Sequence, residues 1–353
     1  MNKKIVITSL ILLIGVVYLF VYSTDNHNIE REINAVKAEN AAITETLELK
    51  MDKWLQDYGV EDTLSIVKNI FSEGLMSADD CHTVLHTAGH LAYQYYPENL
   101  DLLANQDSGL CIGSFYHGVE AQISFSLDFK EPLISYCAEL QKEFPGINCY
   151  HGAGHGFMEV NQSLSRSLKA CDSLKSDIQQ DVTNCYRGVF SEYGARALGY
   201  SGDTGKPIPI TVHLDYENPY EPCQDLDEQY KNSCYTQLSK IIATNNDTNT
   251  AMQKCLNNDF TNKIQKICIE IASAIAARIA LSGSETVATP PTFHLLSPEL
   301  QESYFIGLKD SFLGFNNDKS YRDWRKTCDQ FDSEKEAINC VAVFENPEKT
   351  STW

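Results

Sequence analysis

The spacing of the cysteines constrains this chain more than any other feature. Ten of the twelve form five pairs with 10 to 13 residues between the partners: Cys137/Cys149, Cys171/Cys185, Cys223/Cys234, Cys255/Cys268 and Cys328/Cys340. An even number of cysteines in an exported chain is typical of a disulfide framework. No Cys-x-x-Cys occurs, so the zinc-ribbon and haem-attachment motifs are absent. We expect six disulfides, five within these pairs and one between Cys81 and Cys111.

The same cysteines mark a repeat. Starting from Cys111, the second members of the pairs follow one another after 38, 36, 49, 34 and 72 residues. The interval of 49 contains segment 201–222, which has the glycine and proline content of a loop, and 72 is two periods with one cysteine pair missing. A period in the thirties is the size of a two-helix unit in a solenoid. The expected fold class is all-α: a disulfide-stapled, solenoid-like helical repeat with a period of about 36.

Local signals also favour helices. Ser77 has the properties of an N-cap, acidic residues follow it in the first turn, and Pro97 ends the segment. Residues 264–281 form an apolar, alanine-rich run without proline, which is typical of a buried helix. No alternating run is long enough to predict a sheet.

An apolar stretch precedes the cysteine-rich body. Residues 5–22 provide 18 uncharged residues, just enough to span a bilayer core at about 1.5 Å per residue. Lys3 and Lys4 stand before it, so the positive-inside rule leaves residues 23 onward outside the cytoplasm. The alternative is a cleaved signal peptide, but its apolar region is usually shorter and ends at a small-residue cleavage site. We expect a single-pass membrane anchor and an extracytoplasmic body, periplasmic or at the cell surface.

The predicted organisation combines these features with the charge. It comprises a cytoplasmic stub at 1–4, the anchor at 5–22, a helical spacer at 23–50, histidine-rich repeats at 51–200, the loop insertion at 201–222, C-terminal repeats at 223–346 and a tail at 347–353. The net charge is −20, and setting aside the two lysines before the anchor leaves −22 on the exported part. An exported part with this much negative charge repels nucleic acid and anionic membrane surfaces and attracts cations.

A cluster of histidines is the main functional signal. Six of the nine lie between residues 82 and 155, namely His82, His86, His90, His117, His151 and His155. The run His86-Thr-Ala-Gly-His90 matches His151-Gly-Ala-Gly-His155 at both histidines, the alanine and the glycine before the second histidine. Helical residues four apart project from one face, so each run can present two imidazoles to one ion. Because equivalent positions of stacked repeats face the same groove, we expect the three segments to converge on one metal site.

Carboxylates accompany two of these histidines. Glu120 follows His117 by three residues, and Glu159 follows His155 by four. Each therefore lies on the helix face of its histidine and is a candidate ligand, orienting residue or general base. The C-terminal repeats have no histidine at these positions, so the predicted site is confined to the N-terminal half.

The donor set narrows the choice of ion and of reaction. Imidazoles without a thiolate suit zinc or copper rather than iron, in a mononuclear or dinuclear centre, and haem held by two imidazoles is an alternative. Zinc with an open coordination position would activate water, as in a metal-dependent hydrolase. Copper or iron would support an oxidoreductase.

The competing interpretation involves no metal. A histidine at a glycine-rich contact is often a hydrogen-bonded structural residue, as we expect for His82 taken alone, His213 and His294. An acidic, anchored solenoid can also be a non-catalytic scaffold or adaptor that binds a protein or peptide on its concave face. Such an interface would spread its polar and aromatic residues over all repeats. The confinement of the histidines to three segments favours a metal site.

Overall fold

The computed structural model describes residues 30–36, 43–106, 110–144, 149–174, 182–202, 206–215, 218–244, 246–257, 260–282, 289–314 and 324–349. The predicted membrane anchor at 5–22 lies outside these residues. Within the described ranges, no helix combines the length and the apolar character needed to cross a membrane.

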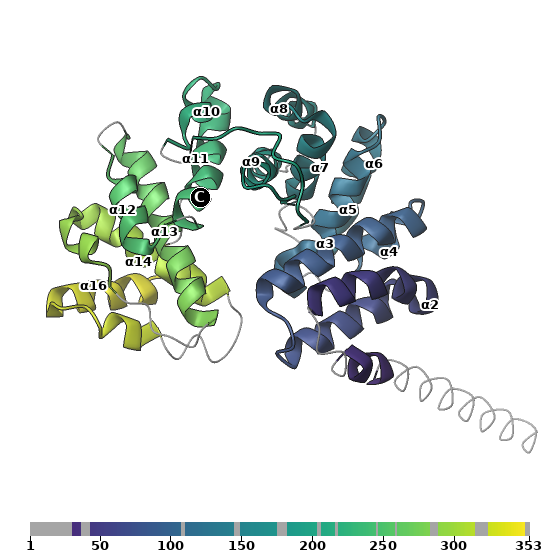
Figure 1. Ribbon diagram of the computed structural model, residues 1–353, viewed down its shortest axis with the longest axis horizontal. Helices are drawn as coiled ribbons and strands as arrows, with labels where there is room; N and C mark the ends of the chain where they lie inside the picture. The colour runs from purple at the N-terminus through teal and green to yellow at the C-terminus, as the bar shows by residue number, and fades with distance from the viewer. Residues whose placement is uncertain are drawn as a thin grey trace, which may run out of the picture. The chain divides into compact units, whose positions relative to one another are not determined.

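The described residues are mainly helical and form no strand, which confirms the predicted all-α class (Figure 1). The first helices are α2 (Ile43–Ser72), α3 (Ala78–Tyr95), α4 (Leu100–Ala104), η1 (Leu110–Gly113), α5 (Ser114–Ser124) and α6 (Lys130–Glu143). They are followed by α7 (His151–Asn161), α8 (Leu164–Asp172), α9 (Thr183–Ala197), α10 (Glu221–Gln224), α11 (Glu228–Thr244), α12 (Thr248–Cys255), α13 (Asn262–Ser282), η2 (Pro291–Leu295), α14 (Pro298–Gly314) and α16 (Glu334–Glu345). Residues 30–36 and 324–328 are helical as well.

The one β-bridge of the described residues joins the start of the predicted loop insertion to the residue just before it. Tyr200 pairs with Pro207 in an antiparallel bridge. The described residues from 201 to 220 have no helix, and α10 begins at Glu221, just inside the predicted range 201–222.

The chain divides into two compact units, residues 1–147 and 148–353. In the first unit, α2 packs on α3, α3 on α5, and α4 on α6. In the second unit, α7, α9, α11, α13, α14 and α16 pack in series, each on the next, while α8 contacts α7 and α9. The boundary at 147 falls inside the segment that we assigned to the histidine-rich repeats.

The start of α3 agrees with its sequence signal. The Ser77 hydroxyl accepts a hydrogen bond from the Asp80 backbone N–H at 3.1 Å, and the Asp80 carboxylate accepts one from the Ser77 N–H at 3.3 Å. This reciprocal capping box satisfies two N–H groups that the first turn of a helix leaves unpaired. The cap thereby fixes where the histidine-bearing helix begins.

Glycines allow two pairs of helices to cross in backbone contact. A Cβ atom at Gly89 of α3 would lie 2.1 Å from the Phe115 carbonyl oxygen of α5, and one at Gly118 would lie 2.1 Å from that of His86. In the second unit, a Cβ at Gly154 of α7 would lie 2.1 Å from a backbone oxygen of α9, and one at Gly188 of α9 would lie 1.9 Å from the His151 carbonyl oxygen. Only glycine permits this approach. Each crossing brings a histidine-bearing helix against its neighbour.

All twelve cysteines are disulfide-bonded, as the spacing predicts, and none is free. Five bridges join Cys81 to Cys111, Cys171 to Cys185, Cys223 to Cys234, Cys255 to Cys268, and Cys328 to Cys340. Cys137 and Cys149 are disulfide-bonded as well. Eleven of the twelve side chains are buried and Cys111 is half-buried, so the bridges are part of the core rather than surface links.

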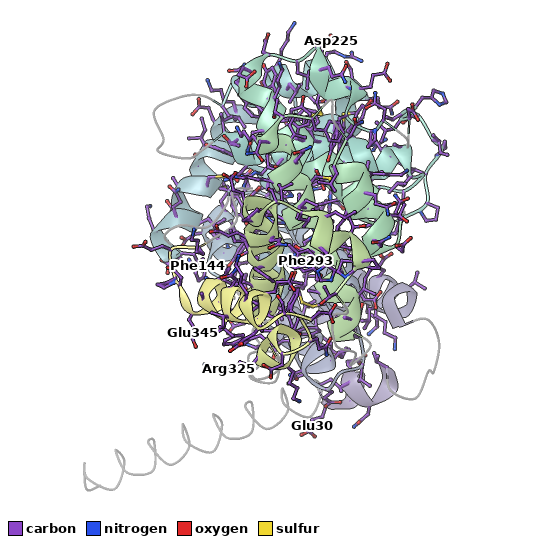
Figure 2. The ribbon with its side chains drawn as sticks, turned by 90° about the vertical axis from the view of Figure 1, so that its left-hand side faces the viewer. Glu30, Phe144, Asp225, Phe293, Arg325 and Glu345 are labelled. Atoms are coloured by element: carbon purple, nitrogen blue, oxygen red, sulfur yellow. A yellow bond between two sulfur atoms is a disulfide. The ribbon has the colours of Figure 1, made fainter. Side chains whose placement is uncertain are left out.

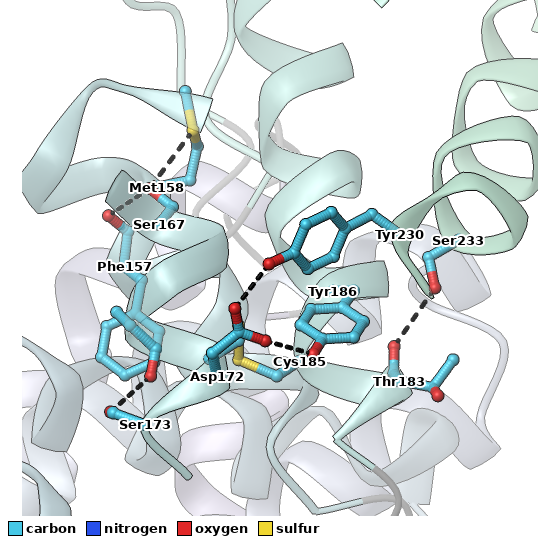
Figure 3. The surroundings of a disulfide bond; sticks show 12 residues. Phe157, Met158, Ser167, Asp172, Ser173, Thr183, Cys185, Tyr186, Tyr230 and Ser233 are labelled. Carbon is cyan, nitrogen blue, oxygen red and sulfur yellow. Dashed lines mark hydrogen bonds between the residues drawn. A yellow bond between two sulfur atoms is a disulfide. The ribbon is translucent and has the colours of Figure 1, made fainter. Parts of the chain in front are cut away.

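A half-buried acid ties three helices together next to one of these bridges (Figure 3). The carboxylate of Asp172 on α8 accepts hydrogen bonds from the Tyr186 hydroxyl of α9 at 2.6 Å and the Tyr230 hydroxyl of α11 at 2.5 Å. The two tyrosine rings pack edge to face with centroids 4.9 Å apart. The Cys171–Cys185 disulfide holds the same part of α8 against α9.

Replacing Asp172 with alanine is expected to lower the free energy of unfolding by roughly 1–3 kcal/mol, because two partly buried tyrosine hydroxyls lose their acceptor. The neighbouring Ser173 is exposed, so Ser173→Ala should stay within about 0.5 kcal/mol of the wild type. Urea unfolding with intact disulfides, followed by circular dichroism, measures both. Equal stabilities for the two variants would contradict the assigned role of Asp172.

The same contact predicts a pH dependence. Burial, followed by the hydrogen bond to Asp172, raises the pKa of Tyr230 to about 12. Because this pKa exceeds that of an unfolded tyrosine, the corresponding stability is present below about pH 10 and is lost as the pH rises towards 12. Tyr230→Phe has no hydroxyl to ionise at this position, so this part of the loss of stability at alkaline pH should be absent from the variant.

The C-terminal helices enclose an aromatic core. Phe293, labelled in Figure 2, packs against Tyr304, Phe305 and Phe331 with ring centroids 5.0 to 5.4 Å apart. Offset and edge-to-face pairs of this kind add to the burial of the rings themselves. This end of the chain is therefore held by apolar packing in addition to its disulfide.

Candidate metal centre

The first unit brings three of the predicted histidines together. His82 and His86 project from α3 and His117 from α5, and one ring nitrogen of each lies within 4.8 Å of the others. The ring centroids are 4.7 Å apart for His82 and His86, 5.4 Å for His86 and His117, and 6.0 Å for His82 and His117. His86 is fully buried, whereas the other two are half-buried. The group can therefore be reached from solvent on one side.

The closest pair has the spacing of two metal ligands. The Nε2 atoms of His82 and His86 are 3.1 Å apart. Nitrogens bound at 2.0–2.1 Å to a tetrahedral zinc ion lie roughly 3.3–3.4 Å apart, so little movement is needed for both to bind one ion. Without an ion, one imidazole can donate its N–H to the other at the same distance.

Contacts on the far side of the ring orient His82. Its Nδ1 lies 3.2 Å from the Cys111 carbonyl oxygen and 2.5 Å from the Ser114 hydroxyl oxygen. A carbonyl only accepts, so Nδ1 carries the hydrogen and Nε2 keeps its lone pair towards His86. Metal-bound histidines are usually held in this way, by a partner on the second nitrogen. The Cys81–Cys111 disulfide fixes the carbonyl next to the ring.

His90 is not a member of the three-histidine group. Its Nδ1 lies 2.9 Å from the side-chain oxygen of Gln122 on α5, and its ring packs against Phe125 with centroids 5.7 Å apart. The expected pairing of His86 with His90 is thus replaced by His82 with His86.

The second unit holds another histidine pair, attached to a buried ion pair. The Nε2 atoms of His151 and His155 on α7 are 3.3 Å apart. The Nδ1 of His155 lies 3.2 Å from Glu192 Oε2 on α9, and Glu192 Oε1 lies 2.8 Å from the Arg196 Nε. That N–H is not directed at the oxygen, so the second contact is an ion pair rather than a hydrogen bond. His155, Glu192 and Arg196 are 3%, 0% and 6% exposed.

The two helix pairs have the same construction. In each, a histidine directly follows the crossing glycine of the first helix, as His90 follows Gly89 and His155 follows Gly154. Its partner stands four residues after the crossing glycine of the second helix: Gln122 in one pair and Glu192 in the other. The pairs therefore differ in charge at one equivalent position.

The two predicted carboxylates occupy other positions. Glu120 is fully buried on α5 and is not part of the three-histidine group. Burial, followed by the charge of Glu120, raises the pKa of Tyr136 well above its usual value. Glu159 is half-buried on α7, one turn beyond His155.

Sequence reasoning missed Ser114, Gln122, Glu192 and Arg196. Ser114 stands three residues before His117 on α5, but the other three do not stand at helical spacing from a histidine in their own helix, so spacing along one helix does not identify them. The signal that could have identified Gln122 and Glu192 is the crossing glycine of the second helix in each pair. The residue four positions after that glycine faces the histidine of the first helix.

The donors present define what this arrangement can do. Three imidazoles bind zinc or copper and leave at least one coordination position for water or a substrate. No thiolate contributes, because every cysteine is in a disulfide. Comparison with known proteins gives no further guidance, since no family model, no curated protein and no solved structure matches the chain.

Proposed function

We propose that this is an extracytoplasmic, membrane-anchored metal-binding protein, with a centre formed by His82, His86 and His117. The observation that carries the proposal is the approach of the three ring nitrogens to within 4.8 Å of one another, from two helices. A structural histidine makes at most one hydrogen bond at each ring nitrogen, so one or two neighbouring groups satisfy it. Three imidazoles directed at each other bring several nitrogen lone pairs to one place, and a cation satisfies them together.

The cysteines support a location of the protein outside the cytoplasm. Six disulfides persist only in an oxidising compartment, which supports export through the predicted anchor at 5–22. The acidic composition favours cations in the surrounding solution. The serial packing from α7 to α16 supports a stack of two-helix repeats with a period near 36.

The reaction class depends on the ion. Zinc at three imidazoles would lower the pKa of a bound water and favour hydrolysis. Copper, which binds more tightly to nitrogen donors, would favour electron transfer or oxidation. We propose zinc or copper rather than iron. His90, Glu120 and Glu159 are assigned no ligand role here, because none belongs to the three-nitrogen group.

The test is metal analysis of the full chain, purified with its disulfides oxidised. The wild type should carry zinc or copper near stoichiometry, or take it up when the ion is added. His82→Ala/His117→Ala should lose this ion. Its affinity should fall by more than the roughly 10–100-fold that is typical when only a residue hydrogen-bonded to a metal ligand is replaced. An optical spectrum of the cobalt-substituted protein reports whether nitrogen ligands are present.

The control is His294→Ala, which removes an imidazole outside the group that contacts Asp332 and Glu336. It should bind metal as the wild type does, and circular dichroism should show an unchanged helix content in all variants. A wild-type chain that holds no metal or haem, and takes up neither zinc nor copper, would refute the proposal. The non-catalytic scaffold would then be the better description.

A further inference from the structure

The histidine pair in the second unit has the spacing of two metal ligands. The Nε2 atoms of His151 and His155 are 3.3 Å apart, a distance at which one imidazole can also donate its N–H to the other. That separation equals the roughly 3.3–3.4 Å edge of a tetrahedral zinc site. The i, i+4 spacing on α7 directs both rings to the same side.

Glu192 determines which nitrogen of His155 is available. The Glu192 carboxylate is fully buried and ion-paired with Arg196 at 2.8 Å. As an acceptor, it requires a hydrogen on the His155 Nδ1. The lone pair of His155 is therefore on Nε2, facing His151. Metal-ligating histidines commonly have this carboxylate–histidine arrangement.

The loop insertion covers the carboxylate. A Cβ atom at Gly202 would lie 2.9 Å from Glu192 Oε2 and 3.0 Å from the Ala195 Cβ. The Ile208 N–H donates to the Gly199 carbonyl at 2.9 Å, and the Ser201 N–H donates to that of Lys206 at 2.8 Å, which closes this part of the loop on itself just after α9. Excluding water there strengthens the Glu192 contacts with its two partners.

We propose that His151 and His155 form a second metal position for a borderline divalent cation such as Zn²⁺ or Cu²⁺, with Glu192 as the positioning residue. Water or an anionic ligand would complete the coordination, because two imidazoles supply only part of a tetrahedral set. This inference does not depend on the centre at His82, His86 and His117, since the two groups share no residue.

The test is a titration of the full chain, disulfides intact, with Zn²⁺ alone, combining calorimetry with elemental analysis after dialysis. The wild type should bind two ions, and His151→Ala and His82→Ala/His117→Ala should each retain one. If the first centre does not exist, the wild type binds one ion, which only His151→Ala removes. The two proposals can thus fail separately.

A matched pair of variants isolates the carboxylate. Glu192→Gln should weaken Zn²⁺ binding at the second position roughly 10–100-fold while leaving the first unchanged. Gln122→Glu changes the equivalent position of the first unit, where His90 is not a ligand, and should leave both affinities unaltered. Nitrogen NMR of the imidazoles adds a direct readout, because Nε2 of His151 and His155 should shift when Zn²⁺ is added.

Three results would overturn the inference. They are full Zn²⁺ binding by His151→Ala, a single ion in the wild type that both histidine variants abolish, and imidazole shifts that do not respond to Zn²⁺. If Glu192→Gln unfolds because Arg196 loses its partner, the NMR shifts and the His151→Ala titration still decide the question.

Discussion

Replacing Gly188 with alanine is expected to destabilise the fold by about 4 kcal/mol or more, at the upper end of what a single substitution does. The added methyl carbon would lie 1.9 Å from the His151 carbonyl oxygen and 3.0 Å from the Gly154 Cα. Both atoms are backbone and cannot rotate away, so α7 and α9 would have to separate. The roughly 1 kcal/mol by which alanine favours a helix over glycine offsets only a small part of this cost.

Gly194 on the same helix is the control. A methyl carbon there would meet the Ile241 Cδ1 at 3.0 Å, the end of a side chain that can change rotamer. Gly194→Ala should therefore remain within about 1 kcal/mol of the wild type. Urea unfolding of both variants measures the difference, with an unchanged m-value as the check that the unfolded states are comparable. If Gly188→Ala is as stable as Gly194→Ala, the helices do not cross in backbone contact.

These crossings show which part of the fold the sequence could predict. Helices, caps and local disulfides depend on neighbours along the chain, and Ser77 and the cysteine spacing specified them directly. Glycine next to histidine in Gly-Ala-Gly-His155 indicated a close helix contact, which Gly154 makes. The identity of the partner helix and its register depend on tertiary packing, and the sequence offered no measure of either.

The histidine pairing differs from expectation for the same reason. His82, His86 and His90 all follow the i, i+4 spacing along α3, so the sequence alone does not select a pair. Gly118 packs against the carbonyl of His86, which puts the preceding His117 level with His82 and His86. One turn further along, α5 presents Gln122 to His90 instead.

Reduction of the disulfides is expected to unfold the protein at ambient temperature. Each bridge that closes a loop of 11 to 14 residues contributes roughly 3 kcal/mol in the chain-entropy model, and Cys81–Cys111, with a separation of 30, contributes somewhat more. Their sum of roughly 15 kcal/mol or more equals or exceeds the whole net stability of an ordinary domain, about 5–15 kcal/mol. Circular dichroism with and without a thiol reductant measures the loss of helix.

Removing single bridges separates stability from metal binding. Cys81→Ser/Cys111→Ser and Cys328→Ser/Cys340→Ser should each lower the unfolding free energy by roughly 3–4 kcal/mol. Only the first should also weaken metal binding at the proposed centre, because Cys81–Cys111 places the carbonyl that holds the Nδ1 hydrogen of His82. If both variants bind metal equally well, the carbonyl does not orient His82. Helix content that survives complete reduction would show that the apolar core suffices without the disulfides.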